Sequence, residues 1–410
     1  MATLRRINQE DLRNHNLSVM ISTILHSERA LSRADIAKKT GLTKATISLL
    51  ATKLLEGGIL KEGLPAMQAV YGRPSTPLVI NGGVICGIGI QVNTDGYGIL
   101  AMDLDGNVIA ERWIAGDFHL AQAPIIFSHI DDMLSEQEAI LREQGYLIAG
   151  AGLALPGLVA DGNKLLVARN LGWEQLDLSE LPFISRLNVK VSNEANMAAI
   201  SQISGYATPV SPDAPAAPNG SFIYVSTDIG IGGALVRNGN LVTGEHGYAG
   251  EFGHLSVSLN GPQCPCGRLG CLEAYAGRRS MVELSGIASD AEAASLESLE
   301  ELIKRGKNGD PAVLRVMSDA FHAMVSALTS TINISDTSTV ILGGLWARLL
   351  DEHIDNLRTD IQQQILAREN VRVEIKRVMG VKHPALVGAA QTGLRYFLEN
   401  PVDFLLPPLP

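Results

Sequence analysis

Residues 250–273 read GEFGHLSVSLNGPQCPCGRLGCLE and carry three of the four cysteines in a chain of 410 residues. Cys264, Cys266 and Cys271 fall within eight residues, and His254 precedes the first of them by ten residues. Three thiolates and one imidazole at this spacing can close a tetrahedral zinc site, and the intervening glycines permit the tight turns that such a site requires. The sequence therefore predicts one structural zinc ion per chain, with a chance grouping of reduced cysteines as the alternative.

Strand-like segments surround this cysteine-rich stretch. Three of them, at 84–90, 97–102 and 108–114, form an apparent meander, with Cys86 as a core residue of the first. A second beginning of the same type lies at 222–236, just before the hairpin signal Asn-Gly at 238–239. Two such beginnings, about 140 residues apart, predict a duplicated α/β architecture with a ligand-binding cleft between two lobes. The Pro- and Ala-rich stretch 208–219 is expected to be an exposed loop.

The composition is that of an ordinary globular protein, with 46% hydrophobic and 19% charged residues, which excludes a disordered, collagen-like or coiled-coil chain. The net charge of −10 is unevenly divided. Residues 1–80 contain eleven Lys or Arg and six Asp or Glu, whereas residues 81–410 contain 22 and 37. A basic head on an acidic body suggests that only the head meets a polyanion.

The basic head has the pattern of three consecutive helices. Apolar residues at helical spacing predict the first helix over 12–25. Ser32 and Asp35 form a predicted capping box for the second helix, which should end at Gly41. The third helix begins at Thr43 and should end near the Gly-Gly pair at 57–58, and a strand follows it into a wing. This order is typical of a winged helix-turn-helix, with a helical hairpin for dimerisation or capping as the structural alternative.

Side chains of the head suit contact with DNA. Small polar residues and Lys44 in the first turns of the third helix can reach base edges and phosphates in the major groove. The linker stretch YGRPSTP at 71–77 can place one arginine along a narrow A·T-rich minor groove, although a plain interdomain linker explains it equally well. The residues that we predict to contact DNA are Arg33, Thr43, Lys44, Thr46, Ser48, Lys53 and Arg73.

From about residue 8 to residue 398 the chain resembles the ROK family (repressors, open reading frames and sugar kinases), specifically its transcriptional repressors. The resemblance rests on GEFGH with CPCGRLGCLE, on SRADIAKKTGLTKATIS at 32–48 and on YGRPSTPLVIN at 71–81. It implies an actin-like, two-lobed α/β ATPase fold fused to a winged helix-turn-helix, and it implies zinc in the His/Cys cluster. By the same resemblance, the residues expected to bind a sugar are Asn170, Asn193, Glu194, Glu251, His254 and Glu273.

The resemblance also predicts the domain organisation. Residues 1–63 should form the winged helix-turn-helix and 64–83 a wing and linker with the Gly-Arg-Pro tripeptide. The sugar-binding domain should cover 84–410, with one lobe at about 84–192 and 381–398 and the other at about 193–380.

Two functions from different classes are then possible, a sugar-responsive repressor and an ATP-dependent sugar kinase. Kinases of the family begin with a segment like GIDIGGT, whose acid helps to hold Mg²⁺, but here Gly89 stands in place of the acid and Gln and Val replace the paired glycines at 91–92. In the second phosphate segment, Asp228 would repel a polyphosphate and Ile231 would block its close approach. The position of the catalytic aspartate holds Glu194, which is longer by one methylene. Three such changes favour the repressor, and we assign no catalytic residue.

The repressor interpretation also predicts partners. We expect a homodimer or homotetramer that binds a palindromic, A·T-rich operator in double-stranded DNA, because one small head makes few phosphate contacts. The effector should be a sugar or a sugar phosphate. No segment is apolar enough for membrane insertion, and the start MATLRRINQE lacks the features of a secretory signal, so the sequence predicts a cytoplasmic protein.

Overall fold

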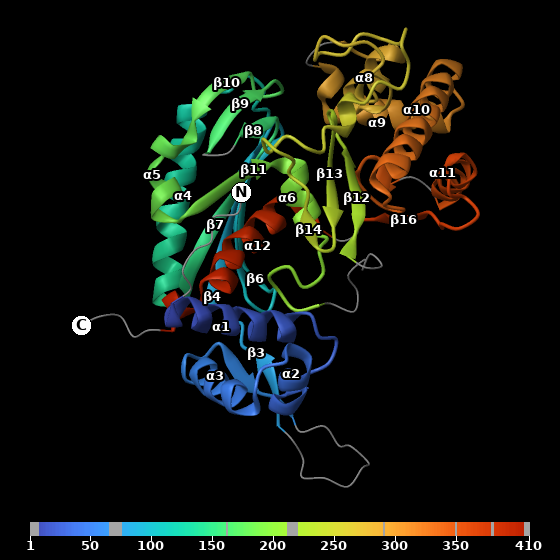
Figure 1. Cartoon of the computed structure of the whole chain (residues 1–410). Helices are drawn as coiled ribbons and strands as arrows, with labels where there is room; N and C mark the ends of the chain where they lie inside the picture. Colours follow the sequence, from blue (N-terminus) through green and yellow to red (C-terminus); the bar gives the residue numbers. More distant parts are fainter. Residues whose placement is uncertain are drawn as a thin grey trace. The chain divides into compact units, whose positions relative to one another are not determined.

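The computed structural model describes residues 8–64, 76–160, 163–210, 220–289, 292–348, 351–378 and 381–405 (Figure 1). The chain divides into two compact units, a first unit of Met1–Ala214 with His383–Pro410 and a second unit of Pro215–Lys382. This division differs from the expected lobe boundary near residue 193, because the helix that begins at Glu194 packs on the C-terminal helix of the first unit. The ideal Cβ position of Gly388 lies only 1.7 Å from the carbonyl oxygen of Met197.

The head of the first unit contains the three helices that the sequence predicted. They are α1 (Gln9–Leu25), α2 (Arg33–Thr40) and α3 (Lys44–Glu56). The capping box of α2 is confirmed, since the Ser32 side chain accepts from the Asp35 N–H while the Asp35 carboxylate accepts from the Ser32 N–H. Gly41 ends α2 in the left-handed conformation, with φ 74°, and the Thr43 side chain caps α3. Local capping therefore fixes the turn between α2 and α3.

A small sheet completes the head as a wing. Its strand order is β1–β3–β2, and all pairs are antiparallel. The strands are β1 (Leu31–Ser32), β2 (Leu60–Glu62) and β3 (Pro77–Ile80). The expected strand after α3 is confirmed as β2, whereas pairing of residues 77–80 with both other strands was not anticipated. The winged helix-turn-helix is therefore closed by a segment that lies beyond the Gly-Arg-Pro stretch.

The first unit is built on a five-stranded sheet of order β11–β7–β4–β5–β6. Strands β4, β5 and β6 form the predicted antiparallel meander, and β7 and β11 run parallel to β4. The strands are β4 (Ile85–Asn93), β5 (Gly96–Asp103), β6 (Val108–Ala115), β7 (Leu147–Leu155) and β11 (Val189–Asn193), and a smaller sheet contains β8 (Leu158–Ala160), β9 (Lys164–Ala168) and β10 (Trp173–Asp177). The helices are α4 (Ala123–Glu143), η1 (Leu178–Glu180), α5 (Pro182–Arg186), α6 (Glu194–Ile200), α12 (Pro384–Glu399) and η6 (Pro401–Phe404).

Glycines allow α12 to pack directly on the centre of this sheet. The ideal Cβ position of Gly87 lies 2.4 Å from the carbonyl oxygen of Ala390, and that of Gly89 lies 2.1 Å from the carbonyl oxygen of Leu386. Such distances exclude any side chain at these positions while the helix remains in place. The contact between β4 and α12 is thus one of backbone against backbone.

The second unit repeats the same plan. Its five-stranded sheet has the order β14–β13–β12–β15–β16, with β12, β13 and β14 antiparallel and with β15 and β16 parallel to β12. The strands are β12 (Phe222–Thr227), β13 (Ile231–Arg237), β14 (Asn240–Leu241), β15 (Thr339–Gly344) and β16 (Glu374–Arg377). The helices are η3 (Phe252–His254), α7 (Glu273–Ala276), α8 (Arg278–Leu284), η4 (Glu292–Ala294), α9 (Leu296–Lys307), α10 (Pro311–Ser335), η5 (Trp346–Arg348) and α11 (Asp351–Gln364). The predicted duplication of an α/β architecture is confirmed.

Each unit has its own buried core. In the first unit, α1 lies between α2 and α3 on one side and the end of α12 on the other (Figure 1), and one buried cluster joins Leu17 and Ile21 of the head to Phe397 of α12. In the second unit, α10 packs on the sheet through residues such as Met324. No helix in the described part of the chain is both long enough and apolar enough to cross a membrane.

Candidate metal centre, DNA-binding face and effector site

The four predicted metal ligands converge in the second unit. The ligand atoms of His254, Cys264, Cys266 and Cys271 all lie within 4.8 Å of one another. The distance from Cys264 Sγ to His254 Nδ1 is 3.6 Å, and that from Cys266 Sγ to Cys271 Sγ is 3.7 Å. Two sulfurs at about 2.3 Å from a tetrahedral zinc ion are about 3.8 Å apart, so both the donor set and its spacing suit zinc.

Local backbone structure brings these ligands together. His254 ends the short helix η3, and Cys264 begins a turn that is closed by a hydrogen bond from the Gly267 N–H to its carbonyl oxygen. Gly267 has φ 92°, which a residue with a side chain adopts rarely. One isolated antiparallel bridge pairs Ser256 with Cys271, and another pairs Gln263 with Leu269. The glycine-rich pattern seen in the sequence therefore does form the tight turns that a zinc site requires.

The protein environment shifts the thiol pKa values of Cys264 and Cys266 in opposite directions. Burial raises the pKa of the Cys264 thiol to about 12. At Cys266 burial acts in the same direction, but hydrogen bonds from the Arg268 backbone and from the two neighbouring thiols outweigh it and lower the pKa. A metal ion binds the thiolate form, so metal binding at this cluster must release protons.

The second unit also holds the acidic residues expected at the effector site. Glu251 follows Gly250, and Glu273 is the first residue of α7. Glu251 keeps an exposed surface, yet the surrounding protein desolvates its carboxyl enough to raise its pKa; the charge of His254 opposes this and that of Glu273 adds to it. The His254 ring and the Glu273 carboxyl are therefore close enough to Glu251 to influence its charge.

Glu273 makes a further contact that the sequence did not indicate. Its Oε2 accepts a hydrogen bond of 2.8 Å from the backbone N–H of Ile231, and the same oxygen lies 2.3 Å from the ideal Cβ position of Gly230. The glycine-containing segment between β12 and β13 thus holds a carboxylate of the protein itself. Beside it, Asp228 forms an ion pair of 3.1 Å with the buried Arg278.

The other predicted effector residues lie in the first unit. Asn193 caps α6, because its Oδ1 accepts from the Ala195 N–H at 2.7 Å while its Nδ2 donates to the Gly157 carbonyl oxygen at 2.7 Å. Asn170 lies in the turn between β9 and β10, and its carbonyl oxygen is 2.8 Å from His119 Nδ1. Both asparagines are half-buried, and the contacts of Asn193 give it a structural role as well.

Glu194 lies at the start of α6 and is held by two amides from β4. Its Oε1 accepts from Gln91 Nε2 at 2.7 Å and from Asn93 Nδ2 at 3.0 Å. Sequence reasoning treated Gln91 only as the loss of a glycine and missed its contact with Glu194. The available signal was two amide side chains separated by one residue, which places them on the same face of a strand.

The residues of α3 and its cap that we predict to contact DNA differ in exposure. Thr43, Lys44 and Ser48 are exposed, whereas Thr46 and Lys53 are half-buried. The hydroxyls of Thr43 and Thr46 lie 2.9 Å apart and serve the helix cap. Leu49 is the large apolar side chain that α3 exposes, at 61%, and Ala45 is exposed one turn before it. Sequence reasoning did not single out Leu49, whose side chain is of the kind that contacts a thymine methyl group.

Arg33, another residue predicted to contact DNA, is the first residue of α2. Arg33 is 3.5 Å from the Glu62 carboxylate of β2, so it links α2 to the wing. Arg73 lies outside the described residues.

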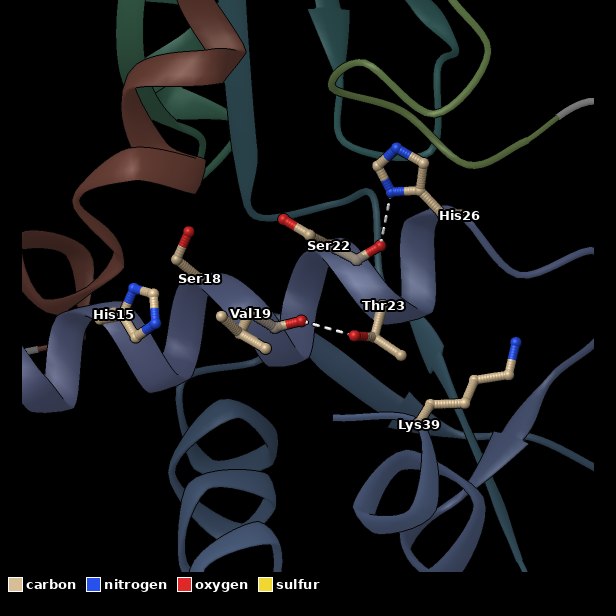
Figure 2. A pocket seen from close by; sticks show the side chains of 7 residues that line it. All are labelled: His15, Ser18, Val19, Ser22, Thr23, His26 and Lys39. Carbon is tan, nitrogen blue, oxygen red and sulfur yellow. Dashed lines mark hydrogen bonds between the residues drawn. The ribbon is translucent and has the colours of Figure 1, made fainter. Parts of the chain in front are cut away.

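A separate open hollow of about 560 Å³ is found along α1, where Figure 2 shows the rings of His15 and His26 with the hydroxyl of Ser18 between them. None of the residues predicted to contact DNA or the effector lines this hollow.

Comparison with known proteins agrees with the two-part architecture. The family model described as "ROK family" matches residues 88–393. The chain is 26% identical over 400 residues to the xylose repressor of Bacillus subtilis, covering 96% of this chain and 98% of that protein. Identity to the glucokinase of Halalkalibacterium halodurans is 25% over 273 residues, covering 63% of this chain and 80% of that enzyme.

A solved structure matches the fold along almost the whole chain. The crystal structure of a ROK family transcriptional regulator, described as a homolog of the E. coli MLC protein, superimposes with a TM-score of 0.75 at 20% identity. It covers 96% of this chain and 99% of that one. A family model that matches about three quarters of the residues, together with the duplicated α/β plan and the His/Cys cluster, leads to one conclusion: this chain belongs to the ROK family.

Proposed function

We propose that the protein is a sugar-responsive repressor that binds operator DNA through its head. The observation that carries this proposal is the coverage of the repressor relatives, which includes the capped helix-turn-helix as well as the ROK domain. The glucokinase match covers a smaller share of this chain. A DNA-binding head adds nothing to a sugar kinase, so its presence favours regulation.

The proposed effector is a neutral sugar, with D-xylose as the first candidate because several relatives are named xylose repressors. Its hydroxyl groups would bind the carboxylate and amide side chains predicted above. Ionised carboxylates only accept hydrogen bonds, so they suit a ligand that is rich in hydroxyl donors. The residues proposed to contribute are Asn170, Asn193, Glu194, Glu251, His254 and Glu273.

Operator binding is best tested without a prior sequence. Full-length protein would be used to select bound fragments from a randomised DNA pool, and we expect a palindrome with two half-sites read by α3 of two subunits, with A·T-rich flanks contacted by Arg73. D-xylose should then release the selected DNA. Selection of no sequence above background would contradict the repressor, and release by none of a panel of sugars would contradict the sugar response.

We further propose that the chain has lost sugar kinase activity. Three contacts support this: α12 leaves no room for an acid at Gly89, two amides occupy Glu194, and Glu273 takes the Ile231 N–H that a phosphate would need. A coupled assay with Mg·ATP and D-xylose or D-glucose should detect no turnover. A rate of about 1 s⁻¹, which is ordinary for a kinase, would instead favour the enzyme.

The metal proposal is one structural zinc ion per chain, bound by His254, Cys264, Cys266 and Cys271. Four protein ligands leave no open position for a water molecule, so the ion would stabilise the 254–271 segment rather than perform chemistry. The backbone of Glu251 and the side chain of Glu273 border this segment, and an ordered segment would keep both acids in place for the effector.

A further inference from the structure

One buried amide in the first unit is only half satisfied. Gln91 is 4% exposed, and its Nε2 donates to Glu194, but its Oε1 has no hydrogen-bond partner among the described residues. A buried carbonyl oxygen without a donor loses its hydration and gains nothing in return. Native proteins keep such groups rarely, and each one calls for an explanation such as a ligand.

The position of Gln91 in the sheet suggests which explanation applies. In the parallel part of the sheet, Gln91 pairs with Ala154 of β7, and Leu155 of β7 pairs with Asn193 of β11. The carboxyl ends of these three strands therefore meet at one edge, and ligands of open α/β sheets bind outside that edge. Glu194 and Asn93 are half-buried there, so the buried amide lies directly behind side chains that reach the surface.

The hydrogen bonds of Glu194 fix which end of the amide faces the ligand. Because the Glu194 carboxylate accepts, the Nε2 group of Gln91 must point toward it, and Oε1 is left as a free acceptor. A hydroxyl group is the simplest donor that matches a single neutral acceptor beside a carboxylate. Asn93 donates to the same carboxylate oxygen and so keeps the Glu194 side chain in one position.

We infer that Gln91 binds the effector directly, with its Oε1 accepting a hydrogen bond from one sugar hydroxyl. Asn93 is a positioning residue, which acts by holding Glu194. The inference rests on the proposed sugar response and adds a contact at a position where kinases of the family have a glycine. The Gln91 side chain stands where the kinases need a glycine to bind phosphate, and it would instead bind a ligand that has no phosphate.

The test compares Gln91→Met with a matched control, Gln391→Met. Gln391, which lies on α12 rather than on β4, is another buried glutamine of the first unit whose Oε1 lacks a partner among the described residues. Calorimetric titration of full-length protein with D-xylose should give a dissociation constant raised about tenfold or more by Gln91→Met and unchanged by Gln391→Met. Operator affinity and thermal midpoint of each variant would establish that it is folded. If Gln91→Met does not fold, Gln91→Asn, which withdraws the oxygen by one methylene, takes its place with the same expected loss.

Monodeoxy analogues of D-xylose then identify the hydroxyl. For the analogue that lacks the bonded hydroxyl, wild type and Gln91→Met should have equal affinities, whereas the other analogues keep the difference. Equal binding of D-xylose by wild type and Gln91→Met, or an equal effect of Gln391→Met, would overturn the inference alone. A wild-type protein that binds none of D-xylose, D-glucose and N-acetylglucosamine would remove the sugar response and this inference together.

Discussion

Cys266 supplies one of the four converging ligand atoms, and its replacement tests the metal centre at the scale of a single residue. Because a serine hydroxyl is far too weak an acid to replace a thiolate, Cys266→Ser should lower bound zinc from one ion per chain to well below one. Metal analysis after dialysis against a weak chelator would measure it. Cys86→Ala is the matched control, since Cys86 lies in β4 outside the cluster. Full zinc content in Cys266→Ser would remove Cys266 from the ligand set.

Lys44 and Glu251 allow DNA binding and sugar response to be separated. Lys44→Ala should weaken operator binding several-fold and reduce the slope of log affinity against log salt by about 1, with unchanged sugar affinity. Glu251→Ala should bind the operator normally and should no longer release it with sugar. Fluorescence anisotropy with labelled operator measures both the operator affinity and its release by sugar. The control for Lys44→Ala is Lys307→Ala, which removes an exposed lysine of α9. Sugar release from Glu251→Ala at the wild-type concentration would show that the effector residues are assigned wrongly.

The sequence could predict the His/Cys cluster much further than it could predict the contact between Gln91 and Glu194. The proposed zinc ligands lie within eighteen residues of one another, so a short motif could predict them, and their convergence is confirmed. Gln91 and Glu194 are separated by 103 residues, and their hydrogen bond depends on how β4 and α6 pack. A motif can name Glu194, but only the folded sheet identifies its partners.

At the scale of elements, the capping box of α2 provides a test of the helix-turn-helix. Ser32→Ala should destabilise the head by about 1 kcal/mol, because the Asp35 N–H in the first turn loses its acceptor. Hydrogen exchange of the α2 amides would report the change. Ser27→Ala is the control, because Ser27 follows α1 and bonds only within its own turn. Unchanged protection in Ser32→Ala would contradict a role for the cap.

The pH dependence of this cap follows from Asp35. Hydrogen bonds from the Ser32 side chain, and then from its backbone, lower the pKa of Asp35 below its ordinary value of 3.8. A lowered pKa in the folded state gives stability that is fully present above about pH 4 and is lost as the pH falls through the folded-state pKa. The difference in α2 protection between wild type and Ser32→Ala should therefore be constant near neutral pH and should narrow below about pH 4, as a pH series of exchange measurements would check.

Helix ends could be predicted because their signals are local, as Ser32, Gly41 and Thr43 illustrate. Strand partners could not. Residues 77–80 form the central strand between β1 and β2, although Pro77 makes the start of this segment resemble the end of a linker. The place of α12 was equally hidden, since Gly87 and Gly89 indicate a close approach without naming the helix that approaches.

At the scale of the first unit, the Asn14 side chain adds two hydrogen bonds to the apolar contact between the head and the C-terminal elements. Asn14 of α1 donates from Nδ2 to the Glu399 carbonyl oxygen at 2.7 Å and accepts at Oδ1 from the Val402 N–H at 3.1 Å. At the other end of α1, the Val210 N–H donates to the Leu25 carbonyl oxygen. These contacts connect α1 to α12 and to the segment that follows α6. Glu194 is the first residue of α6.

Asn14→Ala should leave operator affinity nearly unchanged but weaken the response to sugar, because the head is then less tightly coupled to the elements that carry Glu194. The measurement is the sugar concentration that releases half of the operator, which should rise several-fold. Asn16→Ala is the control, since the described residues give the Asn16 side chain no hydrogen bond to α12 or η6. An unchanged half-release concentration would assign the coupling to other contacts.

The glycine-lined seat of α12 has a consequence for synthesis of the protein. Strands β4 to β6 leave the ribosome about 300 residues before α12 does, which at ordinary elongation rates is a delay of roughly 15–60 s. During that time the nascent sheet exposes the backbone of Gly87 and Gly89 and the apolar residues around them. The head also lacks its apolar contact with α12 until that helix is synthesised. Ribosome-associated chaperones that shield nascent apolar surface should therefore be needed for a good yield of folded protein. A premature stop before residue 384 should produce aggregates rather than a shortened regulator, as the soluble fraction of such a truncation in cell lysates would reveal.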